Sequence, residues 1–158
     1  MSEHYVIIHW SKPSPDFCVG GYSREHTWSF DGGLTVPASP SPQVVPAPWS
    51  NAAYVDPEEA YVASVSSCHM LTFLWVASRA GFAVTSYEDR AVGVMTRNEA
   101  GVPWVSRITL RVRINYEETR SPTPEAEEHL HHQAHEQCFI ANSVKTEIVV
   151  QKLSAEVG

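Results

Sequence analysis

The chain has 158 residues, a length typical of one domain with a hydrophobic core of its own. Its formal net charge of −7 at pH 7 argues against a nucleic-acid partner. No uninterrupted apolar run reaches about 18 residues and the N-terminus does not resemble a signal peptide, so we expect a soluble, cytoplasmic protein with no membrane partner. The three cysteines do not form a secreted disulfide framework, which favours thiols that are free, redox-active or metal-bound.

The N-terminal part of the chain predicts short strands. Residues His4–Lys12 are rich in β-branched and aromatic side chains and indicate a strand. Residues 25–30 alternate polar and aromatic side chains, and the Asp-Gly-Gly sequence that follows predicts a hairpin with a return strand over 34–36. The proline-rich, uncharged stretch 37–55 predicts an ordered but irregular loop.

A long helix is predicted from Pro57 to Ala80, with a length of about 36 Å. Asp56 can cap its N-terminus, with Glu59 completing a capping box, and Gly81 follows its end as a left-handed residue would. Few of its residues are charged, so we expect a core helix that is apolar on most faces.

The C-terminal half predicts two long strands, a second helix and a final strand. The strands span Val84–Thr96 and Trp104–Tyr116, and the second helix begins at Pro124 after the cap Thr123 and continues to about Ile140. The final strand covers residues 145–153. In the second long strand, four apolar residues alternate with polar ones and predict its buried face: Ile108, Leu110, Val112 and Ile114. This order predicts an α+β fold with a largely antiparallel sheet.

Cys68, in the middle of the long helix, has two interpretations. It can be a small apolar residue of the core, or a working thiol. The segment Ser66–His69 around it is more polar than the centre of a buried helix requires, and Cys138 lies in a second polar, helical stretch. In the first interpretation it packs among its neighbours at helical spacing: Tyr61, Val65, Leu71, Thr72 and Trp75.

These residues resemble the OsmC/Ohr superfamily of thiol-dependent peroxidases. The resemblance covers nearly the whole chain and depends on three groups of residues: Arg24 with the turn Asp31-Gly32-Gly33, the cap Asp56-Pro57-Glu58-Glu59 ahead of Cys68, and the segment Cys138–Ser143 after a helix. It implies one OsmC-like domain over residues 1–158. It also implies an α+β fold of antiparallel sheets with two central helices, assembled as an intertwined homodimer.

The resemblance further implies reduction of organic hydroperoxides without a cofactor. By position, Cys68 is the peroxidatic thiol, Cys138 the resolving thiol, Arg24 the activating cation and Glu58 the carboxylate that holds the arginine. An external dithiol, either a lipoyl group or a thioredoxin-like protein, would reopen the disulfide. The apolar side chains expected around Cys68 favour organic peroxides over hydrogen peroxide: Val65, Leu71, Phe73 and Trp75.

Physical chemistry independently requires a cation at Cys68. The thiolate is the nucleophile, and Cys68 lies too far from the helix N-terminus for the helix dipole to stabilise it. Ten residues of helix separate Glu58 from Cys68 by about 15 Å, so one arginine can hardly bond both within a chain. We therefore expect that the Glu58 and Cys68 of one site come from different subunits of a symmetric dimer.

His69 departs from the family pattern, in which an aromatic residue commonly follows the first cysteine. It can bond a backbone carbonyl or the partner subunit. Alternatively, it can be an auxiliary catalytic residue that donates a proton to the leaving alkoxide or tunes the thiol.

Two other functions remain open at this stage. His131, His135 and Cys138 share a face of the second helix, and with Cys68 or His69 they could bind zinc or another transition metal. The protein could also keep the fold as a small-molecule-binding scaffold without peroxidase activity. Cys18 is predicted to have only a structural role.

Overall fold

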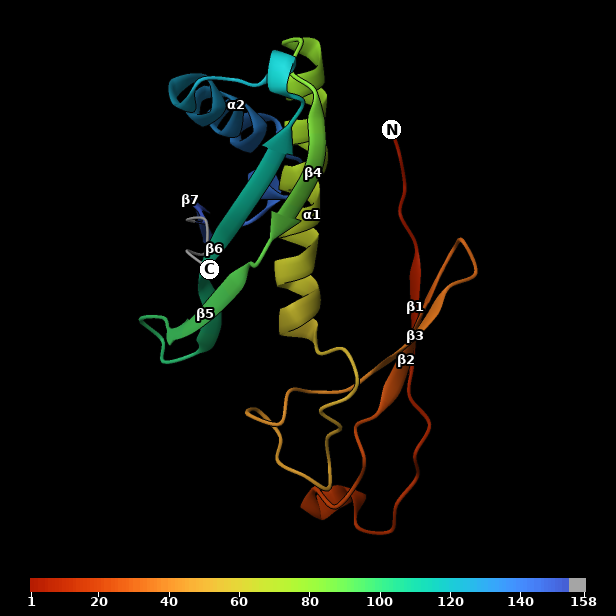
Figure 1. The fold of residues 1–158 in the computed structure, drawn as a ribbon. Coiled ribbons are helices and arrows are strands. Elements are labelled where there is room, and N and C mark those ends of the chain that lie inside the picture. Colours follow the sequence, from red (N-terminus) through yellow and green to blue (C-terminus); the bar gives the residue numbers. More distant parts are fainter. Residues whose placement is uncertain (154–158) are drawn as a thin grey trace, which may run out of the picture. The chain divides into compact units, whose positions relative to one another are not determined.

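The computed structural model describes residues 1–153, which divide into two compact units between Ala60 and Tyr61 (Figure 1). The architecture is α+β, with two helices and two sheets, as the sequence predicts. That the whole chain is one domain stays a prediction.

The first unit is built on an antiparallel sheet of three strands, β1 (Val6–His9), β2 (His26–Phe30) and β3 (Thr35–Ala38), in the order β1-β2-β3. The predicted hairpin therefore forms, with Trp28 opposite Val36 across its two strands. A short 3-10 helix, η1 (Phe17–Val19), lies in the connection between β1 and β2.

The second unit contains a sheet built around the long strand β6 (Pro103–Tyr116), with β4 (Val84–Asp89) and β5 (Val92–Arg97) antiparallel along one edge. On the other edge, β7 (Glu147–Lys152) runs parallel to β6, so this sheet is mixed rather than wholly antiparallel. This final strand, predicted over residues 145–153, covers only Glu147–Lys152.

The predicted strand Val84–Thr96 is interrupted by a side chain that takes the place of a backbone acceptor. Ser86–Asp89 of β4 and Val92–Val94 of β5 share one register along β6, but between them Oδ1 of Asp89 accepts the N–H of Arg111 at 2.7 Å. Oδ2 of Asp89 accepts the hydroxyl of Ser66. The interruption therefore attaches the sheet to the helix that contains Ser66.

That helix is α1 (Pro57–Arg79), and both of its predicted ends form. Asp56 Oδ1 accepts the Glu59 N–H at 2.7 Å, and Glu59 Oε2 accepts the Asp56 N–H at 3.4 Å, which completes the capping box. Gly81 has a φ of 86°, the left-handed conformation that glycine tolerates without strain.

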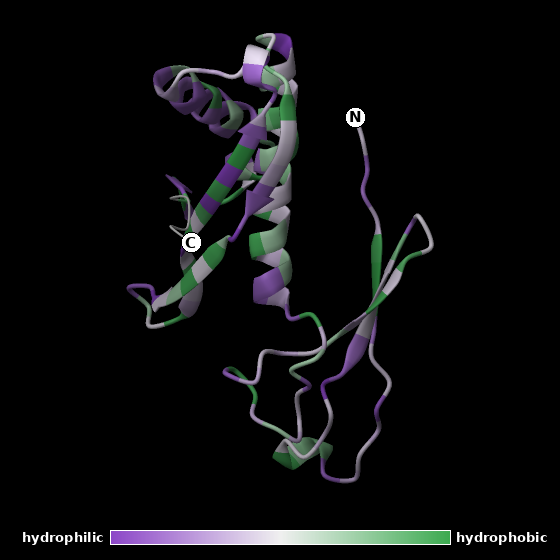
Figure 2. Ribbon diagram, in the orientation of Figure 1, coloured by the Kyte–Doolittle hydropathy of each residue, from purple (hydrophilic) through white to green (hydrophobic). Residues whose placement is uncertain are grey.

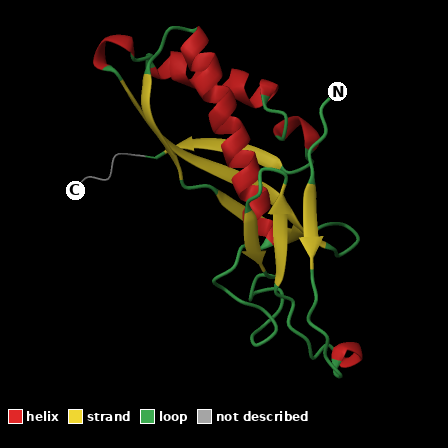
Figure 3. Cartoon of the chain, turned by 90° about the vertical axis from the view of Figure 1, so that its right-hand side faces the viewer, coloured by secondary structure: helices red, strands yellow, loops and turns green. Residues whose placement is uncertain are grey.

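The core of the second unit consists of two apolar clusters on α1. Polar and apolar residues alternate along β6, so that one of its faces is apolar (Figure 2). Val65 of α1 packs against this apolar face. The C-terminal half of α1 packs against the helix α2 (Pro124–Gln137), which lies beside α1 (Figure 3). The two clusters are Val65 with Ile108, Leu110 and Val112, and Phe73, Val76 and Ala77 with Leu130 and Ala134.

α1 is not buried on most faces, contrary to the prediction. Leu71 is 61% exposed and Trp75 is 56% exposed. By length and composition alone, α1 is apolar enough to cross a membrane. This test averages hydropathy over a window, so it tolerates the polar residues near Cys68 that interrupt the apolar run in the sequence. Core helices of soluble proteins have the same composition, and α1 packs on β6 and α2 as such a helix does.

Gly93 on β5 allows α1 to approach the sheet closely, which gives a test of this packing. A Cβ at Gly93 would lie 2.6 Å from Cγ2 of Val62, closer than two carbons can approach. We expect Gly93→Ala to lower the free energy of unfolding by about 1–3 kcal/mol, measured by urea denaturation. Gly32→Ala is the matched control, because a Cβ there meets nothing within 4 Å. An equal loss in both variants would contradict the close packing.

Candidate active site

Two thiols from distant parts of the sequence meet where α1 faces the end of α2. Cys68 lies on α1 and is half-buried, whereas Cys138 is fully buried. α2 ends at Gln137, three residues earlier than predicted, and Cys138 follows it with an extended backbone (φ −71°, ψ 118°). The Asn142 side-chain amide donates to the Cys138 carbonyl at 2.9 Å, which stabilises this early end.

The two thiols lie close together, and each faces a backbone amide. Cys68 is near enough to Cys138 to raise the pKa of the Cys138 thiol. The Ile140 N–H donates to Cys68 Sγ and the Ala141 N–H donates to Cys138 Sγ, each at 3.5 Å. These donors come from the turn that leads into η3 (Ala141–Ser143) and stabilise negative charge on sulfur. Sequence analysis missed both, because every residue except proline has an N–H and no pattern marks which one will face a sulfur.

The environment makes the two thiols chemically unequal. The pKa of Cys138 is raised to about 11, mainly by burial and next by the neighbouring Cys68 thiol, while the Ala141 amide opposes the shift. Cys138 therefore remains a neutral thiol at pH 7 and can donate its proton toward the Cys68 sulfur. Because the thiolate is the reactive form, this favours Cys68 as the first nucleophile.

His69 bonds a second histidine rather than a backbone carbonyl. Its Nε2 lies 3.1 Å from Nδ1 of His131 on α2, and both rings are buried. The Phe73 ring packs on that of His131, with centroids 4.4 Å apart. The remaining nitrogens, His69 Nδ1 and His131 Nε2, have no hydrogen-bond partner among the described residues. His131 was suggested by sequence only as a metal ligand, although it shares a helix face with Ala134, a core residue three positions later.

Both buried imidazoles are neutral at pH 7. The pKa of His69 is lowered from 6.5 to about 4, mainly by burial and to a smaller extent by the neighbouring His131 and His135. Burial likewise lowers the pKa of His131 to about 4, with a smaller contribution from the charge of Lys152. A histidine held neutral in this way is a poor proton donor at pH 7, so the proton-donor alternative for His69 receives no support.

The predicted metal ligands do not come together. His131 and Cys138 are buried, whereas His135 is exposed. Cys138 also lies beyond the end of α2, so the three residues do not share one helix face as predicted. Within residues 1–153, no set of three or more His, Cys, Asp or Glu side chains is arranged to hold a metal ion. We do not carry the metal alternative further.

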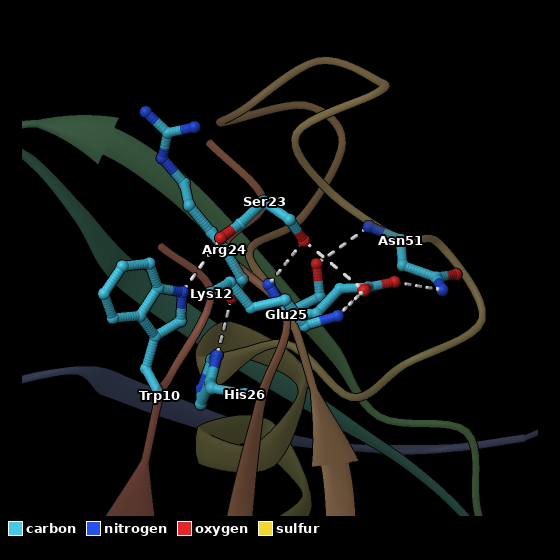
Figure 4. Close-up of polar contacts among 8 residues, drawn as sticks. Trp10, Lys12, Ser23, Arg24, Glu25, His26 and Asn51 are labelled. Carbon is cyan, nitrogen blue, oxygen red and sulfur yellow. Dashed lines mark hydrogen bonds and ion pairs between the residues drawn. The ribbon is translucent and has the colours of Figure 1, made fainter. Parts of the chain in front are cut away.

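Arg24 lies in the first unit, in a network of polar contacts (Figure 4). Its guanidinium donates to the carbonyl of Tyr22 at 3.0 Å and lies 4.0 Å from the centroid of the Tyr22 ring. His26 Nδ1 donates to the Arg24 carbonyl at 2.8 Å, while His26 Nε2 accepts the indole N–H of Trp28 at 2.9 Å. These contacts set the backbone of Arg24 and orient its side chain.

Glu58 lies in the same unit but does not pair with Arg24. Its Oε2 is buried and has no hydrogen-bond partner among residues 1–153. Leaving a buried carboxylate oxygen without a partner is costly, and no described residue offsets this cost at Glu58. Cys18, in η1, is exposed, so the single chain gives it no packing role.

A protein-family model for OsmC-like proteins matches residues 50–152, which is more than half of the chain. The chain belongs to the OsmC-like family. An OsmC-like protein of unknown function from Vibrio cholerae is 49% identical in a match that covers 97% of this chain and 100% of that chain, with a TM-score of 0.92. No curated protein matches significantly.

More distant solved structures share the OsmC-like fold. An organic hydroperoxide resistance protein from Legionella pneumophila is 13% identical, with 96% of this chain and 97% of that chain covered and a TM-score of 0.67. The organic hydroperoxide resistance protein OhrB of Bacillus subtilis is 16% identical, with 96% and 98% covered and a TM-score of 0.65. At this identity the likeness establishes the fold, and the resemblance predicted from sequence is confirmed at the level of the superfamily.

The buried histidines predict acid sensitivity of this OsmC-like protein. A pKa lowered from 6.5 to about 4 on folding means that the unfolded chain binds more protons between these values. The stabilisation is complete above pH 6.5 and is lost as the pH falls through about 4, by roughly 3 kcal/mol for each histidine. Urea denaturation between pH 7 and pH 4 measures this loss.

The control for this prediction is His129→Gln, because His129 is exposed on α2 and has no contact with the pair. We expect His129→Gln to reproduce the wild-type pH profile and His69→Phe to remove about half of the pH dependence, because His131 remains buried. A wild-type profile that is flat between pH 6.5 and pH 4 would mean that the histidines are not held neutral.

Proposed function

We propose that this OsmC-like protein is a thiol-dependent peroxidase that reduces organic hydroperoxides through Cys68 and Cys138. The observation that supports the proposal is the contact between the two thiols, one half-buried and the other fully buried with a raised pKa. A pair of cysteines with only a packing role has no need for sulfur-directed amides such as those of Ile140 and Ala141.

The reaction proceeds in three balanced steps. The Cys68 thiolate attacks the outer peroxide oxygen, the O–O bond breaks, and the alkoxide leaves and takes up a proton, so that Cys68 becomes a sulfenic acid. The Cys138 sulfur then attacks the Cys68 sulfur, and the Cys138 proton leaves with the hydroxyl group as water. Finally, an external dithiol, lipoyl or thioredoxin-like, reduces the disulfide and becomes a disulfide itself.

Exposed apolar side chains beside Cys68 support an organic substrate. Leu71 and Trp75 follow Cys68 at helical spacing and share its face of α1, and Phe139, next to Cys138, is 83% exposed. These side chains can bury the hydrocarbon part of a hydroperoxide. The sequence also proposed Val65 and Phe73 for this surface, but both are fully buried in the core and cannot touch a substrate.

We further propose that the active protein is an intertwined homodimer in which Arg24 activates Cys68 and Glu58 holds the arginine. Two observations support a second chain. Glu58 Oε2 is buried without a partner among residues 1–153, and Leu71 and Trp75 are exposed on a central helix, where a second chain would enclose the substrate against them. The three free cysteines fit a reducing compartment, and we propose the cytoplasm.

Cysteine variants test the peroxidase activity directly. We expect Cys68→Ser to abolish the consumption of cumene hydroperoxide in stopped flow, and Cys138→Ser to permit one round of attack that leaves a trapped sulfenic acid. Cys18→Ser is the control and should turn over as the wild type does, since Cys18 is exposed in another part of the chain. If the wild-type protein leaves the peroxide intact, the scaffold alternative is favoured.

Mixed dimers test whether one site uses two subunits. Cys68→Ser and Glu58→Gln are each expected to be inactive or slow as separate dimers. If Glu58 and Cys68 of a site come from different subunits, unfolding and refolding the two variants together restores a complete site in each mixed dimer, and activity returns to a substantial fraction of wild type. Recovery that does not exceed the sum of the separate variants would show that both residues act within one subunit.

A further inference from the structure

Four residues make two polar contacts across the same interface. Cys68 and His69 are consecutive on α1. His131 lies on α2, and Cys138 is the first residue after the end of α2. The thiols form one contact and the imidazoles form the other. Each contact joins a residue of α1 to a residue of the α2 segment, so the geometry of one contact constrains the geometry of the other.

The apolar part of this interface cannot set the position of α2 by itself. It consists of α1 side chains facing Leu130 and Ala134, which are small or flexible. Apolar contact is non-directional and tolerates small shifts along or around a helix. A hydrogen bond in a low-dielectric interior, by contrast, is strong and requires a specific distance and angle.

Among the described residues, the side chains of His69 and His131 have no hydrogen-bond partner other than each other. The two rings lie within 8° of parallel, and the outer nitrogen of each is buried without a partner in the described chain. If α2 shifted, the bond would break and two more buried nitrogens would lose their only contact. The pair therefore favours a single register of α2 on α1.

That register determines where Cys138 lies. Between His131 and Gln137 the chain is helical over roughly 9 Å, and Cys138 is the next residue. A shift of α2 at His131 is therefore transmitted to the Cys138 sulfur. Disulfide formation is sensitive to such a shift, because the Cα atoms must lie roughly 4.4 to 6.8 Å apart with suitable directions.

We propose that His69 and His131 are positioning residues for the thiol pair: their hydrogen bond holds α2 in the register that brings Cys138 to Cys68. This inference deepens the proposed function and rests on it for the resolving step. The histidines contact neither thiol in this role. They act on the attack of Cys138 on the Cys68 sulfenic acid, with release of water, and not on the attack of Cys68 on the peroxide.

The ring atoms that bond suggest a discriminating set of variants. His131 uses Nδ1, which the side-chain amide of asparagine can imitate, so His131→Asn preserves the bond, whereas His131→Leu removes it. Leu130→Ala loosens the same interface while leaving both histidines in place, and it serves as a control matched for stability. Should His131→Leu fail to fold, His69→Phe removes the bond from the other side.

The experiment measures the two steps separately. Quenched-flow mass analysis with cumene hydroperoxide follows the sulfenic acid and then the Cys68–Cys138 disulfide. We expect His131→Leu to slow disulfide formation on the order of tenfold to a hundredfold, with little effect on the first step, and His131→Asn to restore most of the rate. If Leu130→Ala slows disulfide formation as much as His131→Leu, or if His131→Asn rescues nothing, the pair only packs and the inference is wrong.

A second oxidant separates this inference from the proposed function. Diamide converts two thiols to a disulfide and is itself reduced to the hydrazine, so it requires no peroxidase chemistry. The same order of variants is expected with diamide. A wild-type protein that is inert toward peroxide, yet shows this order with diamide, would overturn the peroxidase proposal alone. Equal diamide rates in wild type, His131→Leu and His69→Phe would overturn the positioning role.

Discussion

The packing of α1 against α2 is the interaction on which the candidate site depends. α1 and α2 are far apart in the sequence and touch through a cluster of apolar side chains around Phe73 and Leu130. This cluster excludes water from the interface, and both the thiol contact and the imidazole contact lie along it. Without the helix contact, Cys68 and Cys138 would be two unrelated residues on different segments.

Burial at this interface produces the chemistry as well as the geometry. The same low dielectric keeps His69 and His131 neutral and raises the pKa of Cys138, because in each case it opposes the charged form. Cys68, half-buried and facing the Ile140 amide, is left as the accessible sulfur of the pair. Two chemically identical side chains thereby acquire the different roles, first nucleophile and resolving thiol, that the proposed reaction requires.

Two residues proposed for this site, Arg24 and Glu58, lie in the first unit. Arg24 is held by contacts within its own unit, and Glu58 has a buried carboxylate oxygen that no described residue satisfies. Apolar side chains of α1 are also exposed, although a helix of this composition is normally covered. The proposed homodimer would cover the helix and supply a partner for Glu58, so it accounts for both observations.

Much of the fold could be predicted from the sequence, because it depends on local patterns. The cap at Asp56, the left-handed Gly81, the hairpin and the alternating face of β6 each follow from short-range backbone and side-chain preferences, and all are present. The sequence by itself also determined the superfamily and the candidate thiols. Only the tertiary structure decided that α2 ends before Cys138, that His69 bonds His131, and that His135 is exposed. Those outcomes depend on which buried groups meet across two helices, and a local pattern holds no information about a partner more than sixty positions away.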